Sequence, residues 1–243
     1  MGVILKCGAV FLHVPKTGGC WVEEALRTTG QMYRYLPHRH ADMTRVMNYR
    51  KFEKFRPRKW FRDRRVGMPT NPMLGVNYRF CFIRHPLKWY ESWWRYMESR
   101  NWNRWGCQGF PDGWHPNSAL NGLGSPDFNE FVANLVHARP GYVTELYSRY
   151  TDERIDFIGK QESLVDDFIQ VLNELNVPFD EEQIRQLAPV NVSQTPKERL
   201  HWDPSLRELV TKLEYPALVR YGYVKDALAE RFNPPAVQLR VAA

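Results

Sequence analysis

Short apolar runs alternate along this chain with longer stretches in which apolar residues return every three or four positions. Residues 10–14, 78–83 and 155–158 form runs of the first kind. Such runs are typical of strands that are buried in a sheet. A weaker run at residues 32–36 predicts a further short strand.

Stretches of the second kind predict helices, because an apolar position every three or four residues forms one face of a helix. The expected helices cover residues 20–29, 42 onward, 87–98, 127 onward, 141–150, 162–175, 180–187, 204–213 and 224–232. Strands that alternate with helices predict an α/β fold, with three layers around a central, mostly parallel sheet. We expect one domain over residues 1–232 and a loosely ordered tail at residues 233–243.

The charge of the chain is concentrated in one segment. The 243 residues are 43% hydrophobic and 25% charged, which is ordinary for a globular protein, and the formal net charge is +7. Residues 50–65 hold nine Lys or Arg against Glu53 and Asp63, so this segment alone accounts for the excess. It can be a solvated face, a surface for an acidic acceptor, or a surface for nucleic acid or anionic membrane. Because no nucleic-acid motif accompanies it, nucleic acid is not an expected partner.

The cysteines and the apolar start of the chain bear on its compartment. The four cysteines are widely spaced and form no CxxC, so a zinc site is not expected and reduced thiols are. No apolar run reaches the roughly 18 residues of a membrane span. The apolar start is interrupted by Lys6 and lacks a cleavage site, so we do not interpret it as a signal peptide. These features predict a cytoplasmic protein.

A glycine turn follows the first predicted strand. Pro15 ends the strand, and the residues Lys16-Thr17-Gly18-Gly19 lead into the next helix. Glycines let the backbone approach a ligand closely, and the helix directs its free N–H groups at the turn. The turn therefore predicts a phosphate or sulfate site, although it can also be a simple strand-to-helix connection. Because the lysine precedes the glycines, the turn is not the Walker loop of ATP- or GTP-binding proteins.

A second candidate anion site follows the strand at residues 78–83. Arg84 closes the strand, Pro86 suits the first turn of a helix, and Ser92 comes about two turns into that helix. An arginine fork and a hydroxyl on one helix face can hold a phosphate monoester. The tryptophans of this helix, Trp89, Trp93 and Trp94, are expected to be core residues.

Together, the stretches HVPKTGGCW and RHPLKWYES resemble the two nucleotide motifs of the sulfotransferases that use 3′-phosphoadenosine-5′-phosphosulfate (PAPS). The stretch FIGKQESLVDDF is similar to a later strand and helix of that family, and the likeness extends over residues 10–223. The form HVPKTGG looks most like the carbohydrate branch, which includes heparan sulfate 2-O-sulfotransferase. The resemblance implies a P-loop-like domain, PAPS as sulfuryl donor, adenosine 3′,5′-bisphosphate as product and no metal.

The resemblance also implies roles for the residues of the first motif. Lys16 would contact the sulfate and the bridging oxygen, where it stabilises charge on the leaving phosphate. The backbone amides around the 5′-phosphosulfate would come from Thr17, Gly18, Gly19 and Cys20. Trp21 would pack on the adenine. Cys20 departs from the usual Thr or Ser of the family, which removes one hydroxyl contact and leaves the amide usable.

The second motif and the acceptor base follow in the same way. Arg84 and Ser92 would hold the 3′-phosphate. Gln161 stands where many members have a tyrosine beside the base, so adenine recognition would differ there. The 2-O-sulfotransferase uses the second histidine of an HxH as base, and His38-Arg39-His40 fits that placement. We favour His40 over His38 for removing the proton of the acceptor hydroxyl, although this HxH can also be an exposed surface turn.

The acceptor is expected to be a hydroxyl-bearing carbohydrate, which can be acidic. Trp102, Trp105 and Trp114 lie in a long loop, where they can stack on a sugar or pack within the loop. Two other functions stay open: a P-loop-type phosphoryl-transfer enzyme, and a non-catalytic module that binds a nucleotide or a polyanion through residues 50–65. The sequence does not indicate the oligomeric state.

Overall fold

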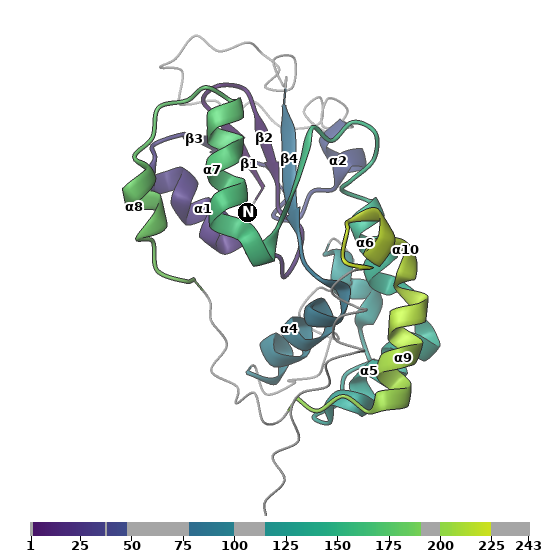
Figure 1. Ribbon diagram of the computed structural model, residues 1–243. Helices are drawn as coiled ribbons and strands as arrows, with labels where there is room; N and C mark the ends of the chain where they lie inside the picture. The colour runs from purple at the N-terminus through teal and green to yellow at the C-terminus, as the bar shows by residue number, and fades with distance from the viewer. Residues whose placement is uncertain (1, 37, 48–77, 100–114, 191–199, 225–243) are drawn as a thin grey trace, which may run out of the picture.

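A computed structural model describes residues 2–36, 38–47, 78–99, 115–190 and 200–224. Within them, five strands form one sheet in the order β3-β1-β2-β4-β5 (Figure 1). The strands are β1 (Val3–Leu5), β2 (Val10–Leu12), β3 (Met32–Tyr35), β4 (Arg79–Ile83) and β5 (Phe157–Lys160). The predicted tail, the basic segment at residues 50–65 and the predicted helix from residue 225 onward lie outside the described residues.

The sheet is mostly parallel, as predicted. Strand β1 runs antiparallel to both of its neighbours, β2 and β3, whereas β2, β4 and β5 pair in parallel. Four of the five strands therefore point in one direction. Strand β1 was not predicted, and it joins β2 through a tight turn in which Gly8 has φ 89°. The amide of Leu5 donates to the carbonyl of Ala9 across this turn (2.8 Å).

Nine α-helices belong to the described part of the chain. They are α1 (Gly19–Thr28), α2 (Met43–Met47), α4 (Pro86–Glu98), α5 (Phe128–Ala138), α6 (Tyr142–Ser148), α7 (Leu164–Glu174), α8 (Glu181–Arg185), α9 (Pro204–Leu213) and α10 (Tyr215–Arg220). The predicted helix start at Asp127 is confirmed, because the Asp127 carboxylate accepts a hydrogen bond from the amide of Glu130 (2.8 Å). Helix α10 was not predicted.

The strands bury apolar side chains on both faces of the sheet. On β2, Phe11 faces a cluster formed with α1, α7 and α8, whereas Val10 and Leu12 face a cluster formed with α2, α4, α5, α6, α9 and α10. Figure 1 shows α1, α7 and α8 together beside the sheet, with α5, α6, α9 and α10 gathered away from them. The mixed α/β fold that the sequence predicts is thus confirmed.

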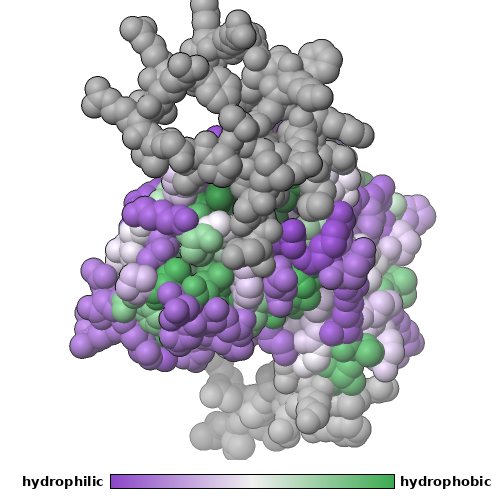
Figure 2. Space-filling view, turned by 90° about the horizontal axis from the view of Figure 1, so that it is seen from above, coloured by the Kyte–Doolittle hydropathy of each residue, from purple (hydrophilic) through white to green (hydrophobic). Residues whose placement is uncertain are grey.

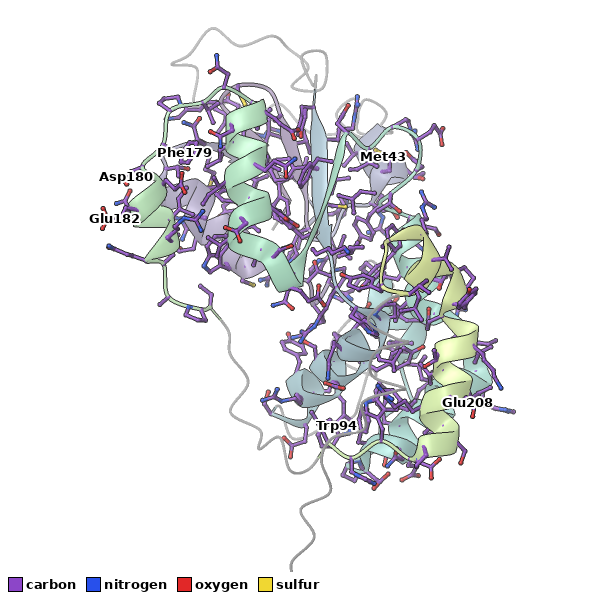
Figure 3. The ribbon with its side chains drawn as sticks, in the orientation of Figure 1. Met43, Trp94, Phe179, Asp180, Glu182 and Glu208 are labelled. Carbon is purple, nitrogen blue, oxygen red and sulfur yellow. The ribbon has the colours of Figure 1, made fainter. Side chains whose placement is uncertain are left out.

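Helix α4 joins the sheet to the group of C-terminal helices. Trp89 and Trp94 are 0% and 1% exposed, so the predicted core role of this tryptophan stripe is confirmed. The indole N–H of Trp94 donates to the carbonyl of Ser125 (3.0 Å), and its ring meets the edge of Phe128. Figure 3 shows Trp94 between α4 and the neighbouring helices. This packing holds α4 against the start of α5.

A buried carboxylate fixes the junction of α9 and α10. Glu214 is fully buried and accepts hydrogen bonds from the hydroxyl of Tyr90 (2.6 Å) and from the amides of Val143 (3.0 Å) and Thr144 (2.7 Å). Both amides belong to the first turn of α6, where the helix dipole favours a negative charge. This network ties α4, α6 and the α9–α10 junction together.

The outer surface has mixed polarity. Figure 2 shows mainly hydrophilic residues on the face seen from above, with smaller hydrophobic areas between them. Among the described helices, none is both long enough and apolar enough to pass through a bilayer.

Candidate functional site

The site lies at the edge of the sheet where three parallel strands end. Leu12 of β2 pairs with Cys81 of β4, and Ile83 of β4 pairs with Lys160 of β5. The segments that follow these strands are the turn at residues 15–19, the Arg84 segment and the residues after Lys160. They therefore leave the same edge of the sheet. In open α/β sheets, this carboxyl edge is where ligands bind.

The turn after β2 has the backbone shape of an anion site. Lys16 has φ 68° and Gly18 has φ 86°, so two of its residues are left-handed. A non-glycine residue in this region stores strain of about 1 kcal/mol or more, and such strain concentrates at functional sites. Turns that combine left- and right-handed residues form concave nests of N–H groups. The Thr17 hydroxyl donates to the carbonyl of Val14 (2.9 Å), so it braces the turn.

The turn presents unused amide donors. Along the described turn and the start of α1, the amide of Trp21 is the first that has a backbone partner. It donates to the carbonyl of Gly18 (2.9 Å). Four amides that come before it have no backbone or side-chain acceptor among the described residues: those of Thr17, Gly18, Gly19 and Cys20. They lie at the positive end of α1, a ten-residue helix without an acidic residue in its first turn. This arrangement suits an anion.

The segment after β5 packs directly on the turn. A Cβ atom at Gly18 would lie 2.7 Å from Cδ2 of Leu164 and 3.4 Å from Cγ of Gln161. Gly18 is therefore required both by its positive φ and by this close approach. Gln161 therefore lies beside the turn.

Gly19 gives room to a neighbouring histidine. A Cβ atom at Gly19 would lie 2.2 Å from Cδ2 and 2.4 Å from Nε2 of His13, which is 3% exposed. An imidazole held inside a core cannot withdraw from such a clash without displacing its neighbours. The absence of a side chain at Gly19 thus positions the His13 ring.

We expect Gly19→Ala to destabilise the fold by about 1–3 kcal/mol, through overpacking against His13. The measurement is urea unfolding. The control is Gly30→Ala, because a Cβ at Gly30 meets nothing within 4 Å and only its φ of 66° is unfavourable. That control is expected to cost about 1 kcal/mol. A Gly19→Ala protein that is as stable as the parent would contradict the close packing described here.

Helix α4 lies against the Lys16 turn. The indole N–H of Trp89 donates to the carbonyl of Pro15 (2.9 Å), and Nζ of Lys16 lies 4.0 Å from the centre of the Tyr96 ring. At about 100° per residue, Ser92 is about 60° from Trp89 and about 40° from Tyr96 around the helix axis. Ser92 is therefore on the side of α4 that meets the turn.

Arg84 continues from β4 at the same edge. Its carbonyl accepts from the hydroxyl of Tyr147 (2.8 Å), and its amide donates to the same oxygen (3.2 Å), so its backbone is fixed. Burial lowers the pKa of its guanidinium, partly offset by Tyr147 and Glu162. Nε of Arg84 is buried and has no hydrogen-bond partner among the described residues. A buried cationic donor without a partner is costly, and an anion would satisfy it.

The structure separates the two histidines of the HxH. His40 is 7% exposed, and its Nδ1 lies 2.8 Å from the carbonyl oxygen of His13, whereas His38 is exposed. A carbonyl oxygen only accepts, so Nδ1 of neutral His40 carries the proton and Nε2 carries the lone pair. Burial lowers the pKa of His40 to about 4, and the charges of Arg39 and Lys16 contribute to this shift. His40 is therefore a neutral imidazole whose Nε2 carries the basic lone pair.

A third histidine, not predicted from the sequence, completes a cluster. The ring of His40 lies 4.6 Å from the ring of His13 and 4.6 Å from that of His115, both in edge-to-face contact. His115 is 6% exposed, and its Nδ1 accepts from the amide of Asn117 (3.0 Å). Burial lowers the pKa of His115 to about 3, with His40 as the next cause. Three imidazoles thus meet beside the Lys16 turn.

Ring contacts connect this cluster back to Lys16. His115 stacks on Trp93 (6.1 Å), Trp93 stacks on Tyr96 (5.5 Å), and Tyr96 lies under the Lys16 ammonium. A continuous series of side-chain contacts therefore connects Lys16 to His40, the candidate base. The sequence motifs predict that Lys16, His40, Arg84 and Ser92 act together, and the structure places them around the same sheet edge.

Two residues of the first motif have other surroundings. Trp21 is 5% exposed and meets the ring of Phe168 edge-on at 5.6 Å, within the core on the α7 side. This placement does not favour the expected adenine contact. Sγ of Cys20 accepts a hydrogen bond from Nη2 of Arg39 (3.5 Å), which links α1 to the segment that carries His40.

The loop tryptophans Trp102, Trp105 and Trp114 and the basic residues 50–65 lie outside the described residues. In the described part of the chain, no three His, Cys, Asp or Glu side chains are arranged to hold a metal ion.

Comparisons of the chain with protein-family models, with curated proteins and with solved structures found no match. Function is therefore argued from the geometry at this edge of the sheet. The arrangement offers a cluster of amides with a lysine, a separate buried arginine, and a neutral imidazole with its basic nitrogen unprotonated. It can hold a ligand with two anionic groups and accept a proton nearby.

Proposed function

We propose that this protein is a PAPS-dependent sulfotransferase with a three-layer, P-loop-like α/β domain. The observation that carries the proposal is the pair of cationic positions after two adjacent parallel strands. One is the Lys16 turn after β2 with its four amides, and the other is Arg84 after β4, whose Nε has no partner in the described part of the chain. A nucleotide with a phosphosulfate at one end and a 3′-phosphate at the other matches two such positions. Ser92 supports the second of them.

The chemistry assigned to this site is an in-line transfer. The nucleotide supplies the sulfuryl group and the leaving phosphate. The acceptor oxygen forms a bond to sulfur while the bond from sulfur to the bridging oxygen breaks, and that electron pair stays on the adenosine 3′,5′-bisphosphate. Lys16 and the turn amides stabilise this negative charge. Nε2 of His40 takes the proton of the acceptor hydroxyl, and its Nδ1–H stays bonded to the carbonyl of His13.

The charge balance of the site favours a base that becomes stronger with the nucleotide present. His40 has a pKa of about 4, and the positive charges of Arg39 and Lys16 are among the causes. A bound polyanion offsets those charges, so the pKa of His40 rises toward neutrality. A base whose pKa lies near the working pH is the more effective one.

We keep a hydroxyl-bearing carbohydrate as the acceptor in this proposal.

The nucleotide part of the proposal is tested by thermal shift. Adenosine 3′,5′-bisphosphate is expected to raise the melting temperature, and 5′-AMP much less, because only the first carries a 3′-phosphate for Arg84. Arg84→Ala is expected to weaken bisphosphate binding by about 10- to 100-fold, which is the effect of losing charge-assisted hydrogen bonds. Ser92→Ala is expected to have a smaller effect in the same direction.

The control for Ser92 is Ser99→Ala. Ser99 belongs to the end of the same helix, is exposed, and donates to the carbonyl of Tyr96 (2.9 Å). This variant should bind the bisphosphate as the parent protein does. Equal stabilisation by the bisphosphate and by 5′-AMP, or an Arg84→Ala protein that binds both normally, would remove the second anion position and the proposal with it.

A further inference from the structure

One exposed carboxylate joins three parts of the chain beside Arg84. Glu162 lies in a short 3₁₀ helix, Gln161–Ser163, which directly follows β5. Its Oε1 accepts a hydrogen bond from the amide of His85, the residue after Arg84 (2.8 Å). Its Oε2 accepts from the hydroxyl of Tyr223, which follows α10 (2.8 Å). The Glu162 carboxylate therefore connects the ends of β4 and β5 with the segment after α10.

The backbone at Arg84 is held from two sides. The Tyr147 hydroxyl bonds to both the amide and the carbonyl of Arg84. Glu162 bonds to the next amide along the chain, that of His85. Tyr147 is 0% exposed, whereas Glu162 is exposed, so the Glu162 bond can be removed without opening the core. A guanidinium directs its donors at a phosphate best when the backbone that carries it is fixed in this way.

The segment after α10 is docked on the ends of the same two strands. Tyr223 is 1% exposed, and its ring meets the ring of His85 edge-on, with the centres 5.1 Å apart. Nζ of Lys160, the last residue of β5, lies 4.6 Å from the centre of the Tyr223 ring and donates to the carbonyl of Gly222 (3.4 Å). These contacts hold the Tyr223 hydroxyl in place, so it can orient the Glu162 carboxylate.

Glu162 also acts on Arg84 through its charge. Burial lowers the pKa of the Arg84 guanidinium, and Tyr147 and Glu162 offset part of this effect. The carboxylate therefore lies close enough to Arg84 to favour its charged form. The same negative charge repels an anionic ligand at this position. The hydrogen bonds of Glu162 and its charge thus have opposite effects on phosphate binding, and a pair of variants can separate them.

We propose that Glu162 is a positioning residue of the second anion position, which fixes the Arg84 segment so that the guanidinium meets the 3′-phosphate. Tyr223 holds the Glu162 carboxylate for this task. The inference rests on the proposed function, and it adds two residues that lie outside the two nucleotide motifs. Because both act through Arg84, their effect is confined to ligands that carry a 3′-phosphate.

The test compares Glu162→Ala with Glu162→Gln. Ala removes both the hydrogen bonds and the charge, whereas Gln keeps an oxygen acceptor for the His85 amide and removes the charge. By calorimetry, Glu162→Ala is expected to bind adenosine 3′,5′-bisphosphate about 10-fold more weakly than the parent protein, although it has lost a repelling charge. Glu162→Gln is expected to bind it at least as tightly as the parent protein does. Tyr223→Phe is expected to weaken binding about 3-fold.

Two further measurements exclude a general loss of structure. Adenosine 5′-phosphosulfate lacks a 3′-phosphate, and its affinity is expected to be the same in the parent protein and in these variants. The control Asp180→Ala removes an exposed carboxylate that also accepts from a backbone amide, that of Gln183 (3.1 Å), and should leave bisphosphate binding unchanged. Without nucleotide, the His85 amide is expected to exchange its hydrogen faster in Glu162→Ala than in the parent protein and in Glu162→Gln.

The outcomes separate the inference from the proposed function. If the parent protein binds the bisphosphate and Glu162→Ala binds it equally well or more tightly, the inference fails and the proposed function stands. A Glu162→Gln protein as weak as Glu162→Ala, an unchanged exchange rate at His85, or equal weakening for both nucleotides would also overturn the inference alone. A parent protein that does not bind the bisphosphate removes the proposed function, and the role of Glu162 with it.

Discussion

His40→Ala is expected to lower the rate of sulfuryl transfer by about 10²- to 10⁴-fold, the range for removal of a general base. The affinity for adenosine 3′,5′-bisphosphate is expected to change little, because the nucleotide is held by the Lys16 turn and by Arg84. Transfer is measured with ³⁵S-labelled PAPS and binding by calorimetry. The lost rate reflects the absence of Nε2, the nitrogen that is left basic by the bond between Nδ1 and the carbonyl of His13.

The matched control is His38→Ala, which removes an exposed imidazole two residues earlier in the same segment. This variant should transfer at the parental rate. Equal losses in both variants would assign the effect to the segment rather than to His40. A parent protein that binds the bisphosphate but transfers nothing would favour the non-catalytic nucleotide-binding module. Transfer of phosphate from ATP in its place would favour the phosphoryl-transfer enzyme.

The meeting of the two motifs was predictable from the sequence. Each motif follows a short apolar run, and parallel strands bring their carboxyl ends to one edge of a sheet. The parallel pairing of Leu12 with Cys81 brings the two strand ends to the same edge, as expected. Helix starts were also predictable, because a capping residue such as Asp127 is a local signal in the sequence.

Other elements depend on contacts that no local pattern reports. Strand β1 has only three residues, and only residues 6–9 separate it from β2, so the Gly8 turn was not recognised. Helix α10 is six residues long and is held by the buried Glu214 at its start. Trp21 shares a helix face with the buried Val22 and Ala25, and this core stripe outweighs the motif-based adenine role.

His115 is the residue of the site that sequence reasoning missed. It is 75 positions from His40 and lies in a stretch without helical or strand periodicity. Helix α4 packs on the Lys16 turn, and its Trp93 stacks on the His115 ring that contacts His40, so the position of His115 depends on long-range contacts. The available signal in the sequence was a histidine within a stretch rich in Gly, Pro and Trp, and this signal does not identify the residues that it contacts.

Lowering the pH from 6.5 toward 4 is expected to destabilise the fold steeply. The folded protein holds His13, His40 and His115 neutral, because burial lowers all three pKa values, to about 4 for His40 and about 3 for His115. The unfolded chain binds protons at these histidines below pH 6.5, so acid favours unfolding. Stability is fully present above pH 6.5 and is lost as the pH falls through this window toward the folded pKa values. For His40 alone the loss amounts to about 3 kcal/mol.

The test is the free energy of unfolding in urea at several pH values between 6.5 and 4.5. Near pH 5, each neutral buried histidine contributes a slope of about 1.4 kcal/mol per pH unit. His115→Phe is therefore expected to lower the slope of the unfolding free energy against pH by that amount. The contributions of carboxylates to this slope are the same in the parent protein and the variant, so they cancel in the comparison. The control His201→Phe removes an exposed imidazole and should leave the slope unchanged. If the parent protein and His115→Phe showed the same slope, His115 would be protonated in the folded state.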